Sequence, residues 1–184
     1  MSGDKIIVRV STITDLIYVQ TITEEIERAS ADPSTSILKR SASLIAEKIM
    51  TGNAVIAVTN NGKWVGFCYL QTWSKGEFVA NCGLVVAIKY RRMGVALRIK
   101  KKIIELSKQK YPESKLFGLT TSLAVMKINS DLGYKPVTYA QITRDDDFWS
   151  GCKHCNNYAI LEARERKNCL CTAMIYTNEN IESY

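Results

Sequence analysis

The first fifty residues change from a strand-like to a helical pattern of apolar positions. Residues 5–10 (KIIVRV) alternate and are rich in β-branched side chains, so they predict a first strand. Isoleucine and leucine then recur at helical spacing over two segments. We expect one helix from Thr12 or Thr14 to about Ala31, and a second helix over about 36–50.

The pattern returns to that of strands in the middle of the chain. Residues 53–59 and 63–72 flank Asn60-Asn61-Gly62. An Asn-Gly pair tolerates positive φ, so this segment predicts a β-hairpin. Residues 77–88 predict one more long strand.

Helices and strands alternate in the second half. We expect helices over 94–110, 122–132 and 158–166, strands over 115–120, 134–139 and 169–176, and polar, irregular chain over much of 141–168. The resulting order, β-α-α-β-β-β-α-β-α-β-β, predicts an α/β (α+β) fold with a mixed, mostly antiparallel central sheet flanked by helices. With no linker or repeat, we expect a single domain over 1–184 that contains a cysteine-rich segment at 145–172.

Length and composition fit this interpretation. The chain has 184 residues, 46% of them apolar, which is enough for one hydrophobic core. No uninterrupted apolar run is longer than that of Leu84–Ile88, which is too short to cross a membrane. Residues 1–5 lack the apolar core of a signal peptide, so we expect a cytoplasmic protein.

The net charge of +7 is concentrated in one place. Residues 89–102 carry no acid and seven basic side chains: Lys89, Arg91, Arg92, Arg98, Lys100, Lys101 and Lys102. One local cluster favours a phosphorylated ligand over a broad nucleic-acid footprint. The alternative is a solvated helix face, because the helical stripe of Ala96, Ile99, Ile103 and Leu106 leaves the lysines outside it.

The beginning of this cluster has the features of an anion site. A strand ends near Ile88, a basic turn follows, and Gly94 stands at the start of a helix. The first N–H groups of a helix have no partner within the helix and lie at the positive end of its dipole. Gly94 and Ala96 would let a pyrophosphate approach the backbone, and Arg91 and Arg92 add positive charge.

At these residues the sequence resembles the GNAT family of acyl-CoA-dependent N-acyltransferases. Arg91–Ala96 (RRMGVA) satisfies the family's pyrophosphate-loop pattern, Arg/Gln-x-x-Gly-x-Gly/Ala. The preceding Leu84-x-Val86 and Tyr90-Arg91 also match the family's lead-in to this loop. Ile88 and Arg92 depart from it, because Pro and Gly are common at those positions.

The resemblance implies a GNAT fold in which the fourth and fifth strands splay apart and hold the pantetheine arm of acyl-CoA. The backbone of Leu84–Val86 would bind that arm, the N–H groups of residues 92–97 would hold the pyrophosphate, and the Val86 N–H would polarise the thioester carbonyl. The implied cofactor-binding set is Leu84, Val85, Val86, Arg91, Arg92, Met93, Gly94, Val95, Ala96, Leu97, Ser122 and Asn129.

Catalytic groups are less clearly marked in the sequence. Asn129 stands where many family members have a tyrosine that protonates the leaving thiolate, and Ser122 replaces the asparagine that often opens that helix. An asparagine can donate a hydrogen bond but cannot act as an acid. Glu77 is the candidate for the general base, with an exposed strand carboxylate as the alternative. Tyr139 and Tyr158 are further candidates for the acid.

A second resemblance concerns the acceptor. Two segments, Ser114–Thr121 and Gly133–Val137, are similar to segments of the acyltransferase domain of bacterial N-acetylglutamate synthases. The implied reaction moves an acetyl or succinyl group from acyl-CoA to a small amino acid, with L-glutamate in arginine biosynthesis as the leading acceptor. Four cations could bind its carboxylates: Lys39, Arg40, Arg144 and Lys153. A protein amine or polyamine is the alternative acceptor, and a nucleic-acid-binding module or a zinc-stabilised adaptor is the alternative class; a homodimer stays open.

The six cysteines fall into two groups. Cys68 and Cys82 lie in predicted strands and fit core positions. Cys152, Cys155, Cys169 and Cys171, with His154 between the first two, could form a structural zinc site, a redox pair or free thiols. We assign no metal ligand.

Overall fold

A computed structural model describes residues 5–32, 35 and 37–177 of the chain. The strands of this part are β1 (Ile6–Val10), β2 (Ala54–Thr59), β3 (Trp64–Trp73), β4 (Phe78–Val86), β5 (Lys115–Thr120), β6 (Tyr134–Val137) and β7 (Thr172–Tyr176). Its α-helices are α1 (Val19–Ser30), α2 (Ala42–Met50), α3 (Val95–Lys110), α4 (Leu123–Asp131), α5 (Asp146–Gly151) and α6 (Tyr158–Ala163).

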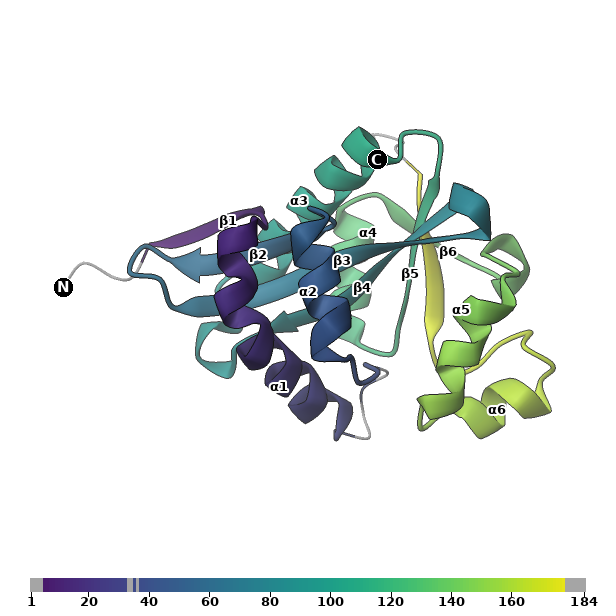
Figure 1. The fold of residues 1–184 in the computed structure, drawn as a ribbon. Helices are drawn as coiled ribbons and strands as arrows, with labels where there is room; N and C mark the ends of the chain where they lie inside the picture. Colours follow the sequence, from purple (N-terminus) through teal and green to yellow (C-terminus); the bar gives the residue numbers. More distant parts are fainter. Residues whose placement is uncertain (1–4, 33–34, 36, 178–184) are drawn as a thin grey trace.

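The strands form one sheet in the order β1-β2-β3-β4-β5-β7-β6 (Figure 1). β4 and β5 run parallel, whereas every other neighbouring pair is antiparallel. The crossover from β4 to β5 passes through α3, and β7 inserts between β5 and β6. This mixed, mostly antiparallel sheet flanked by helices confirms the fold class predicted from the sequence.

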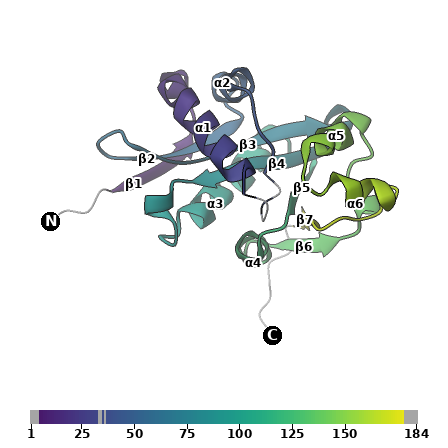
Figure 2. The ribbon, with the colours of Figure 1, turned by 90° about the horizontal axis from the view of Figure 1, so that it is seen from below.

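Helices cover both faces of the sheet (Figure 2). α1 and α2 lie on one face, where Ile22, Ile26 and Ile45 pack against β2 and β3. α3 and α4 lie on the other face, and Ile99 and Ile103 of α3 are fully buried there. α5 and α6 pack their own apolar side chains at the β4, β5 and β7 end, so the sheet holds three adjoining cores.

Local turn and capping residues fix several of these elements. Gly62 closes the β2–β3 hairpin with a φ of +80°, a left-handed conformation that favours glycine. Thr12 opens a 3-10 turn over Ile13–Tyr18 that leads directly into α1. The Ser41 hydroxyl accepts a hydrogen bond from the backbone N–H of Leu44 at 3.2 Å and begins α2 there.

Several boundaries differ from the prediction. α2 starts at Ala42 rather than near residue 36, which itself lies outside the described residues, because Ser41 caps it. β4 ends at Val86, where a 3-10 turn over Ile88–Tyr90 takes over. β7 begins only at Thr172, because the backbone of Cys171 turns back onto the Cys169 sulfur. β6 also ends two residues early, at Val137.

α5 was missed altogether. The run of acidic residues around it reads as irregular chain, but Asp145 accepts a hydrogen bond from the backbone N–H of Asp147 and caps the helix. Trp149 then anchors α5 in the third core. Of the helices in the described ranges, none is long and apolar enough to cross a membrane.

Strands β4 and β5 separate after a short paired segment. Their pairing covers only Phe78–Ala80 of β4 against Lys115–Phe117 of β5, and the two strands diverge beyond it. A β-bulge at Gly83, whose φ is +63°, adds a bend to β4 at this point. The predicted splay of the fourth and fifth strands is therefore present, and it leaves the second half of β4 without a β5 partner in the described sheet.

Candidate active site

The loop from β4 to α3 is held in a strained, open conformation. Arg92 and Gly94 both adopt left-handed backbone angles, with φ of +62° and +72°. The Arg91 guanidinium turns back to donate to the Val86 carbonyl at 3.0 Å, which ties the loop to the end of β4. A Cβ added at Gly94 would meet nothing within 4 Å, so the space in front of the helix is free of protein atoms among the described residues.

The N-terminus of α3 presents unpaired donors to that space. The hydrogen bond from the Arg98 N–H to the Gly94 carbonyl, at 3.1 Å, closes the first turn of the helix. The N–H groups of Val95, Ala96 and Leu97 precede it and have no partner within the helix. The first turn contains no acidic residue, so the helix dipole and these donors favour an anion.

The basic cluster of residues 89–102 is not one continuous patch. Arg98 donates to the Ile6 carbonyl at 2.8 Å and fixes β1 to α3. Lys102 pairs with Glu105 at 2.7 Å. Lys100 is fully buried, which corrects the prediction that the lysines lie outside the buried stripe. Three members of the cluster are therefore engaged in anchoring, pairing or burial, and Lys89, Arg92 and Lys101 are left exposed, a smaller surface than a nucleic-acid footprint needs.

The floor of the β4–β5 gap is polar. The Lys100 ammonium donates to Oδ1 of Asn81 at 2.8 Å, and the Tyr134 hydroxyl donates to the same oxygen at 3.0 Å. The ammonium also lies 4.6 Å from the centre of the Tyr134 ring. Burial lowers the pKa of Lys100 to about 8. A Cβ on Gly118 of β5 would come within 3.2 Å of the Asn81 amide, so Asn81 lies where the two strands begin to part.

Sequence reasoning missed this cluster because the helical stripe of α3 is ambiguous. Lys100 precedes the buried Ile103 and Ile104 by three and four positions, so it shares their helix face as much as Ile99 does. A lysine next to such a stripe is normally assigned to solvent. Only the spacing to both isoleucines could have indicated its burial.

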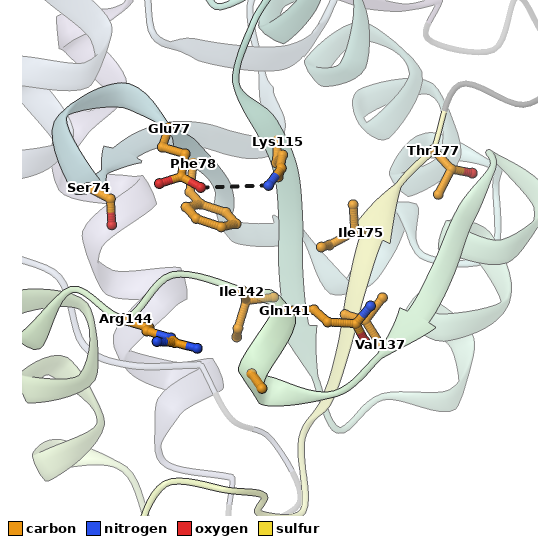
Figure 3. A pocket seen from close by; sticks show the side chains of 11 residues that line it. Ser74, Glu77, Phe78, Lys115, Val137, Gln141, Ile142, Arg144, Ile175 and Thr177 are labelled. Carbon is orange, nitrogen blue, oxygen red and sulfur yellow. Dashed lines mark ion pairs between the residues drawn. The ribbon is translucent and has the colours of Figure 1, made fainter.

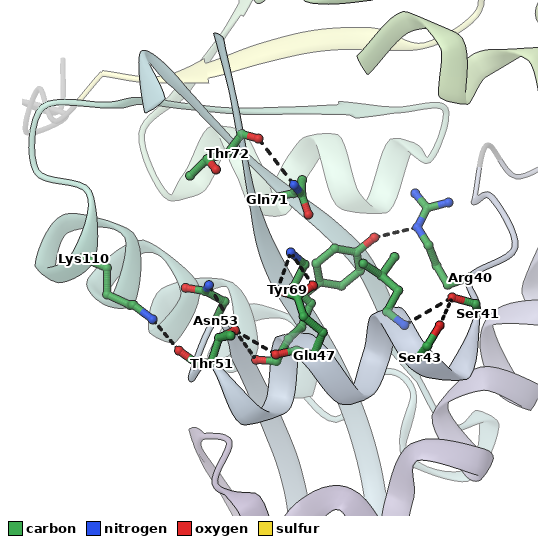
Figure 4. Close-up of polar contacts among 12 residues, drawn as sticks. Arg40, Ser41, Ser43, Glu47, Thr51, Asn53, Tyr69, Gln71, Thr72 and Lys110 are labelled. Atoms are coloured by element: carbon green, nitrogen blue, oxygen red, sulfur yellow. Dashed lines mark hydrogen bonds and ion pairs between the residues drawn. The ribbon is translucent and has the colours of Figure 1, made fainter. Parts of the chain in front are cut away.

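The opposite face of β4 carries a second cation. The Arg40 Nε donates to the Tyr69 hydroxyl at 2.6 Å (Figure 4). Tyr69 is directly paired with Cys82 of β4, and its ring packs against Gly83 of the bulge. Burial raises the pKa of Tyr69 well above its usual value, so the phenol stays neutral and the Arg40 charge is not cancelled by it. The guanidinium therefore lies beside the bulge, on the α1–α2 side of the sheet.

The other three candidate cations lie elsewhere. Lys39 forms an exposed ion pair with Glu27 at 2.6 Å. Arg144 lines a cavity at the start of β4, and Lys153 lies in a short 3-10 turn before α6. Of the four candidate cations, Arg40 is the one placed beside the middle of β4, through its hydrogen bond to Tyr69, which pairs with Cys82.

Asn129 and Ser122 have structural partners in α4. The Ser122 hydroxyl caps the helix by accepting from the Val125 N–H at 3.4 Å. Asn129 is only 2% exposed; its amide donates to the Met174 sulfur at 3.6 Å, and its Oδ1 has no hydrogen-bond partner among the described residues. An orphaned carbonyl oxygen is costly in a core, and Asn129 has no proton to give.

Glu77 directly precedes β4, at the opposite end of the strand from the bulge. Figure 3 shows its carboxylate facing the Lys115 ammonium. Glu77 lines a cavity of about 690 Å³ and pairs with Lys115 at 3.6 Å. Seven residues of extended chain separate it from Leu84, a distance of roughly 20 Å. That distance is too long for direct proton transfer to a group bound at Leu84.

The two tyrosines named as candidate acids are engaged in the C-terminal segment. Tyr158 donates to Glu162 at 3.2 Å on the surface of α6. The Tyr139 hydroxyl lies 2.8 Å from both the Cys169 sulfur and the Cys171 carbonyl. These hydrogen bonds hold both tyrosine hydroxyls within the segment between β6 and β7.

The four cysteines of the cysteine-rich segment are thiols that form no disulfide in the described structure. Within the described residues, no group of three or more His, Cys, Asp or Glu side chains is arranged to hold a metal ion. A hydrogen bond from the Cys171 thiol, helped by the Tyr139 hydroxyl and the Cys171 N–H, lowers the pKa of Cys169 to about 6. Burial, in contrast, raises the pKa of Cys68 to about 12.

Comparison with known proteins identifies the fold. No protein-family model matches the sequence, and no curated protein matches it significantly. Among solved structures, Rv2747 from Mycobacterium tuberculosis, in complex with CoA and NLQ, has a TM-score of 0.65 at 15% identity over 94% of this chain and 99% of that one.

Two further solved structures have a similar fold. N-acetylglutamate synthase from Neisseria gonorrhoeae, complexed with coenzyme A and N-acetyl-glutamate, has a TM-score of 0.64 at 16% identity and aligns with 94% of this chain, which spans 35% of that protein. A GNAT superfamily phosphinothricin acetyltransferase from Sinorhizobium meliloti, in complex with AcCoA, has a TM-score of 0.61 at 13% identity over 98% of this chain and 96% of that one. At these identities the likeness establishes a shared fold.

Proposed function

We propose that this chain, which has the GNAT fold, is an acyl-CoA-dependent N-acyltransferase whose acceptor is the amine of a small amino acid. The observation that carries the proposal is the junction of the β4–β5 gap with the free N-terminus of α3. Acyl-CoA needs an anion site for its pyrophosphate and a slot for its pantetheine arm, and these two features adjoin here.

The donor would bind across both features. The unpaired N–H groups of Val95, Ala96 and Leu97 would hold the pyrophosphate, with Arg92 and Met93 of the loop beside it. The arm would run along the unpaired half of β4, where Leu84, Val85 and Val86 offer backbone groups that β5 does not use. One of these N–H groups, assigned to Val86, would polarise the thioester carbonyl.

The acceptor would approach from the other face of the sheet. Arg40 lies there beside the bulge of β4, in reach of a carboxylate on an amine-bearing substrate. The structure of N-acetylglutamate synthase, which has a similar fold, was solved in complex with N-acetyl-glutamate. We therefore assign L-glutamate as the leading acceptor, with acetyl or succinyl as the acyl group and arginine biosynthesis as the corresponding pathway.

The chemistry requires a direct transfer. The acceptor amine attacks the thioester carbonyl carbon, the C–S bond breaks, and CoA leaves as a thiolate. The amine must lose a proton on the way, and a water chain would carry it, because Glu77 lies roughly 20 Å along the strand. The rate would then fall at low pH as the acceptor amine becomes protonated.

Arg40→Met tests the acceptor assignment. If Arg40 binds the acceptor carboxylate, the KM for glutamate should rise at least tenfold while the KM for the acyl donor stays within twofold. Lys39→Met is the matched control, because Lys39 is the adjacent cation and pairs with Glu27 at the surface.

Two results would overturn the proposal. An unchanged KM for glutamate in Arg40→Met would remove Arg40 from the acceptor site. Turnover of a polyamine or a peptide amine, with none of glutamate or other small amino acids, would replace the acceptor class. Light scattering on the same preparation would show whether the chain forms a homodimer.

A further inference from the structure

Four of the six cysteines lie between β6 and β7, and the sulfur atoms of two of them are neighbours. Cys171 follows Cys169 by two residues, and its backbone N–H donates to the Cys169 sulfur at 3.3 Å. The Cys171 thiol hydrogen-bonds the same sulfur. Neither residue forms a disulfide in the described structure. The two sulfur atoms are therefore within hydrogen-bond reach, where a sulfur–sulfur bond needs only a small movement of the chain.

A bend in the backbone brings the two sulfur atoms together. In an extended strand, the Cα atoms of residues two positions apart are separated by roughly 6.6 Å, near the upper limit that a disulfide spans. Here the chain bends at Leu170 and Cys171, and β7 begins only after them, at Thr172. Leu170 is 60% exposed, whereas Cys169 packs against the third core. Both cysteines thus lie outside the sheet ladder, where the backbone can adjust to a disulfide.

The Tyr139 hydroxyl provides a partner for the Cys169 sulfur with or without its proton. It lies 2.8 Å from that sulfur and 2.8 Å from the Cys171 carbonyl oxygen, and it has one proton to donate. Beside a Cys169 thiol, the hydroxyl donates to the carbonyl and accepts from the thiol. Beside a thiolate, it donates to the sulfur. Together with the donors of Cys171, this arrangement supports the thiolate, the form of cysteine that acts as a nucleophile.

The surroundings distinguish Cys169 from the other thiols of the segment. The Cys171 thiol, then Tyr139 and the Cys171 N–H, lower the pKa of Cys169 to about 6, whereas burial raises the pKa of Cys152 to about 11. Cys155 closes a turn before α6, where its sulfur accepts from the Asn157 N–H at 3.5 Å. Cys169 is therefore the nucleophile of the segment, and Cys171 is the thiol already in contact with it.

We propose that Cys169 and Cys171 form a reversible disulfide on reaction with a small hydroperoxide, with Cys169 as the attacking thiolate and Cys171 as the resolving thiol. The inference is independent of the proposed function, because neither sulfur belongs to the site assigned to the acyl donor or to the acceptor.

The peroxide balances the reaction. The Cys169 sulfur attacks one oxygen of hydrogen peroxide, the O–O bond breaks, hydroxide leaves, and Cys169 becomes a sulfenic acid. The Cys171 sulfur then attacks the Cys169 sulfur, the S–O bond breaks, and the oxygen leaves as water with the Cys171 proton. The two sulfur atoms lose two electrons in all, and the peroxide gains them. A dithiol reductant reverses the change, because a disulfide closed over one intervening residue is strained and readily reduced.

The test oxidises the reduced protein with hydrogen peroxide at pH 7, blocks the remaining thiols with N-ethylmaleimide in denaturant, and maps the products by mass spectrometry. Trypsin releases residues 168–184 as one peptide, in which Cys169 and Cys171 are the only cysteines. We expect this peptide to lose two hydrogen atoms and to take up no maleimide. Treatment with dithiothreitol before blocking should restore two maleimide-reactive thiols.

The variants separate the two roles. Cys171→Ser should stop at the sulfenic acid of Cys169, which dimedone traps, whereas Cys169→Ser should give no dimedone adduct on Cys171. Cys152→Ser is the matched control, because Cys152 packs against the same core. It should form the Cys169–Cys171 disulfide at a rate within about twofold of the wild type. Thermal unfolding shows that each variant is folded, and the mapping of the wild type provides a test by itself.

Three outcomes would overturn the proposal. The first is a disulfide from Cys169 to Cys152 or Cys155, which trypsin would release as two linked peptides. The second is a wild type in which both thiols of the 168–184 peptide stay reduced while other cysteines oxidise. The third is a stoichiometric metal ion in the reduced protein that is lost in Cys169→Ser, because a coordinated sulfur is not available as the nucleophile. Each of these results leaves the proposed function standing.

Discussion

Single residues in this chain carry conformations and charges that stability alone does not explain. Lys100 places an ammonium in a core lined by Ile99, Ile103 and Tyr134, where an apolar side chain of similar length would fit the packing. Gly94 holds a left-handed backbone in front of open space. Gly94 belongs to the loop assigned to the pyrophosphate, and Lys100 lies beside Asn81 of β4.

Lys100→Met should stabilise the protein at neutral pH. Burial holds the folded-state pKa of Lys100 at about 8, below its ordinary 10.5, so the unfolded chain binds more protons between those values. The penalty is complete below pH 8 and disappears as the pH rises through this window. We expect Lys100→Met to gain about 1–3 kcal/mol at pH 7 and less at pH 10, measured by urea unfolding. A variant that is less stable at both pH values would show that the charge is structural.

Gly94→Glu should remove CoA binding without unfolding the chain. A Cβ added at Gly94 meets nothing within 4 Å, and the rest of the glutamate side chain places bulk and a negative charge before the N-terminus of α3. We expect CoA affinity to fall at least a hundredfold, about 2.7 kcal/mol, by calorimetry. Gly94→Asn is the control, because asparagine tolerates the left-handed φ and adds no charge. Unchanged affinity in folded Gly94→Glu would remove the loop from the donor site.

At the scale of elements, periodicity and turn chemistry located most of the fold, including β5 and α3 almost to the residue. The short α5 escaped prediction because its cap, Asp145, lies in a run of acidic residues that also suits a loop. The loop that leads into α3 could be predicted because the residues that mark it, Arg91–Ala96, are adjacent in the sequence. The Lys100–Asn81–Tyr134 cluster could not, because it joins α3, β4 and β6, and only the sheet order brings those elements together.

The segment between β6 and β7 contains the most reactive thiol that we expect in the chain. Hydrogen bonding lowers the pKa of Cys169 to about 6, and its side chain is half-buried, whereas Cys68 is fully buried with a pKa of about 12. Iodoacetamide at pH 7 should therefore label Cys169 first and Cys68 last. Peptide mass spectrometry after different labelling times measures this order. Tyr139→Phe should slow the labelling of Cys169, because it removes one of the stabilising hydroxyls. Equal labelling of Cys169 and Cys68 would contradict the assigned pKa values.

At the scale of the whole molecule, the sites proposed for the donor and for the acceptor lie on the two sides of β4. The α3 side offers anion-binding N–H groups and a gap, and the α1–α2 side offers Arg40 beside the bulge. A donor and an acceptor bound on these two sides would meet through the sheet without competing for space. Three residues of the basic cluster serve this arrangement locally, because Arg91 anchors the loop, Arg98 fixes β1 and Lys100 lies in the core.

The most direct test of the account is glutamate-dependent release of free thiol from acetyl-CoA and from succinyl-CoA, followed with a thiol reagent. The reagent must be added after quenching, because Cys169 would itself react with it. We predict release from at least one of the two esters that rises with glutamate concentration, saturates, and is lost in Gly94→Glu. Binding of an acyl-CoA with no thiol release for glutamate or any other small amino acid would contradict the account.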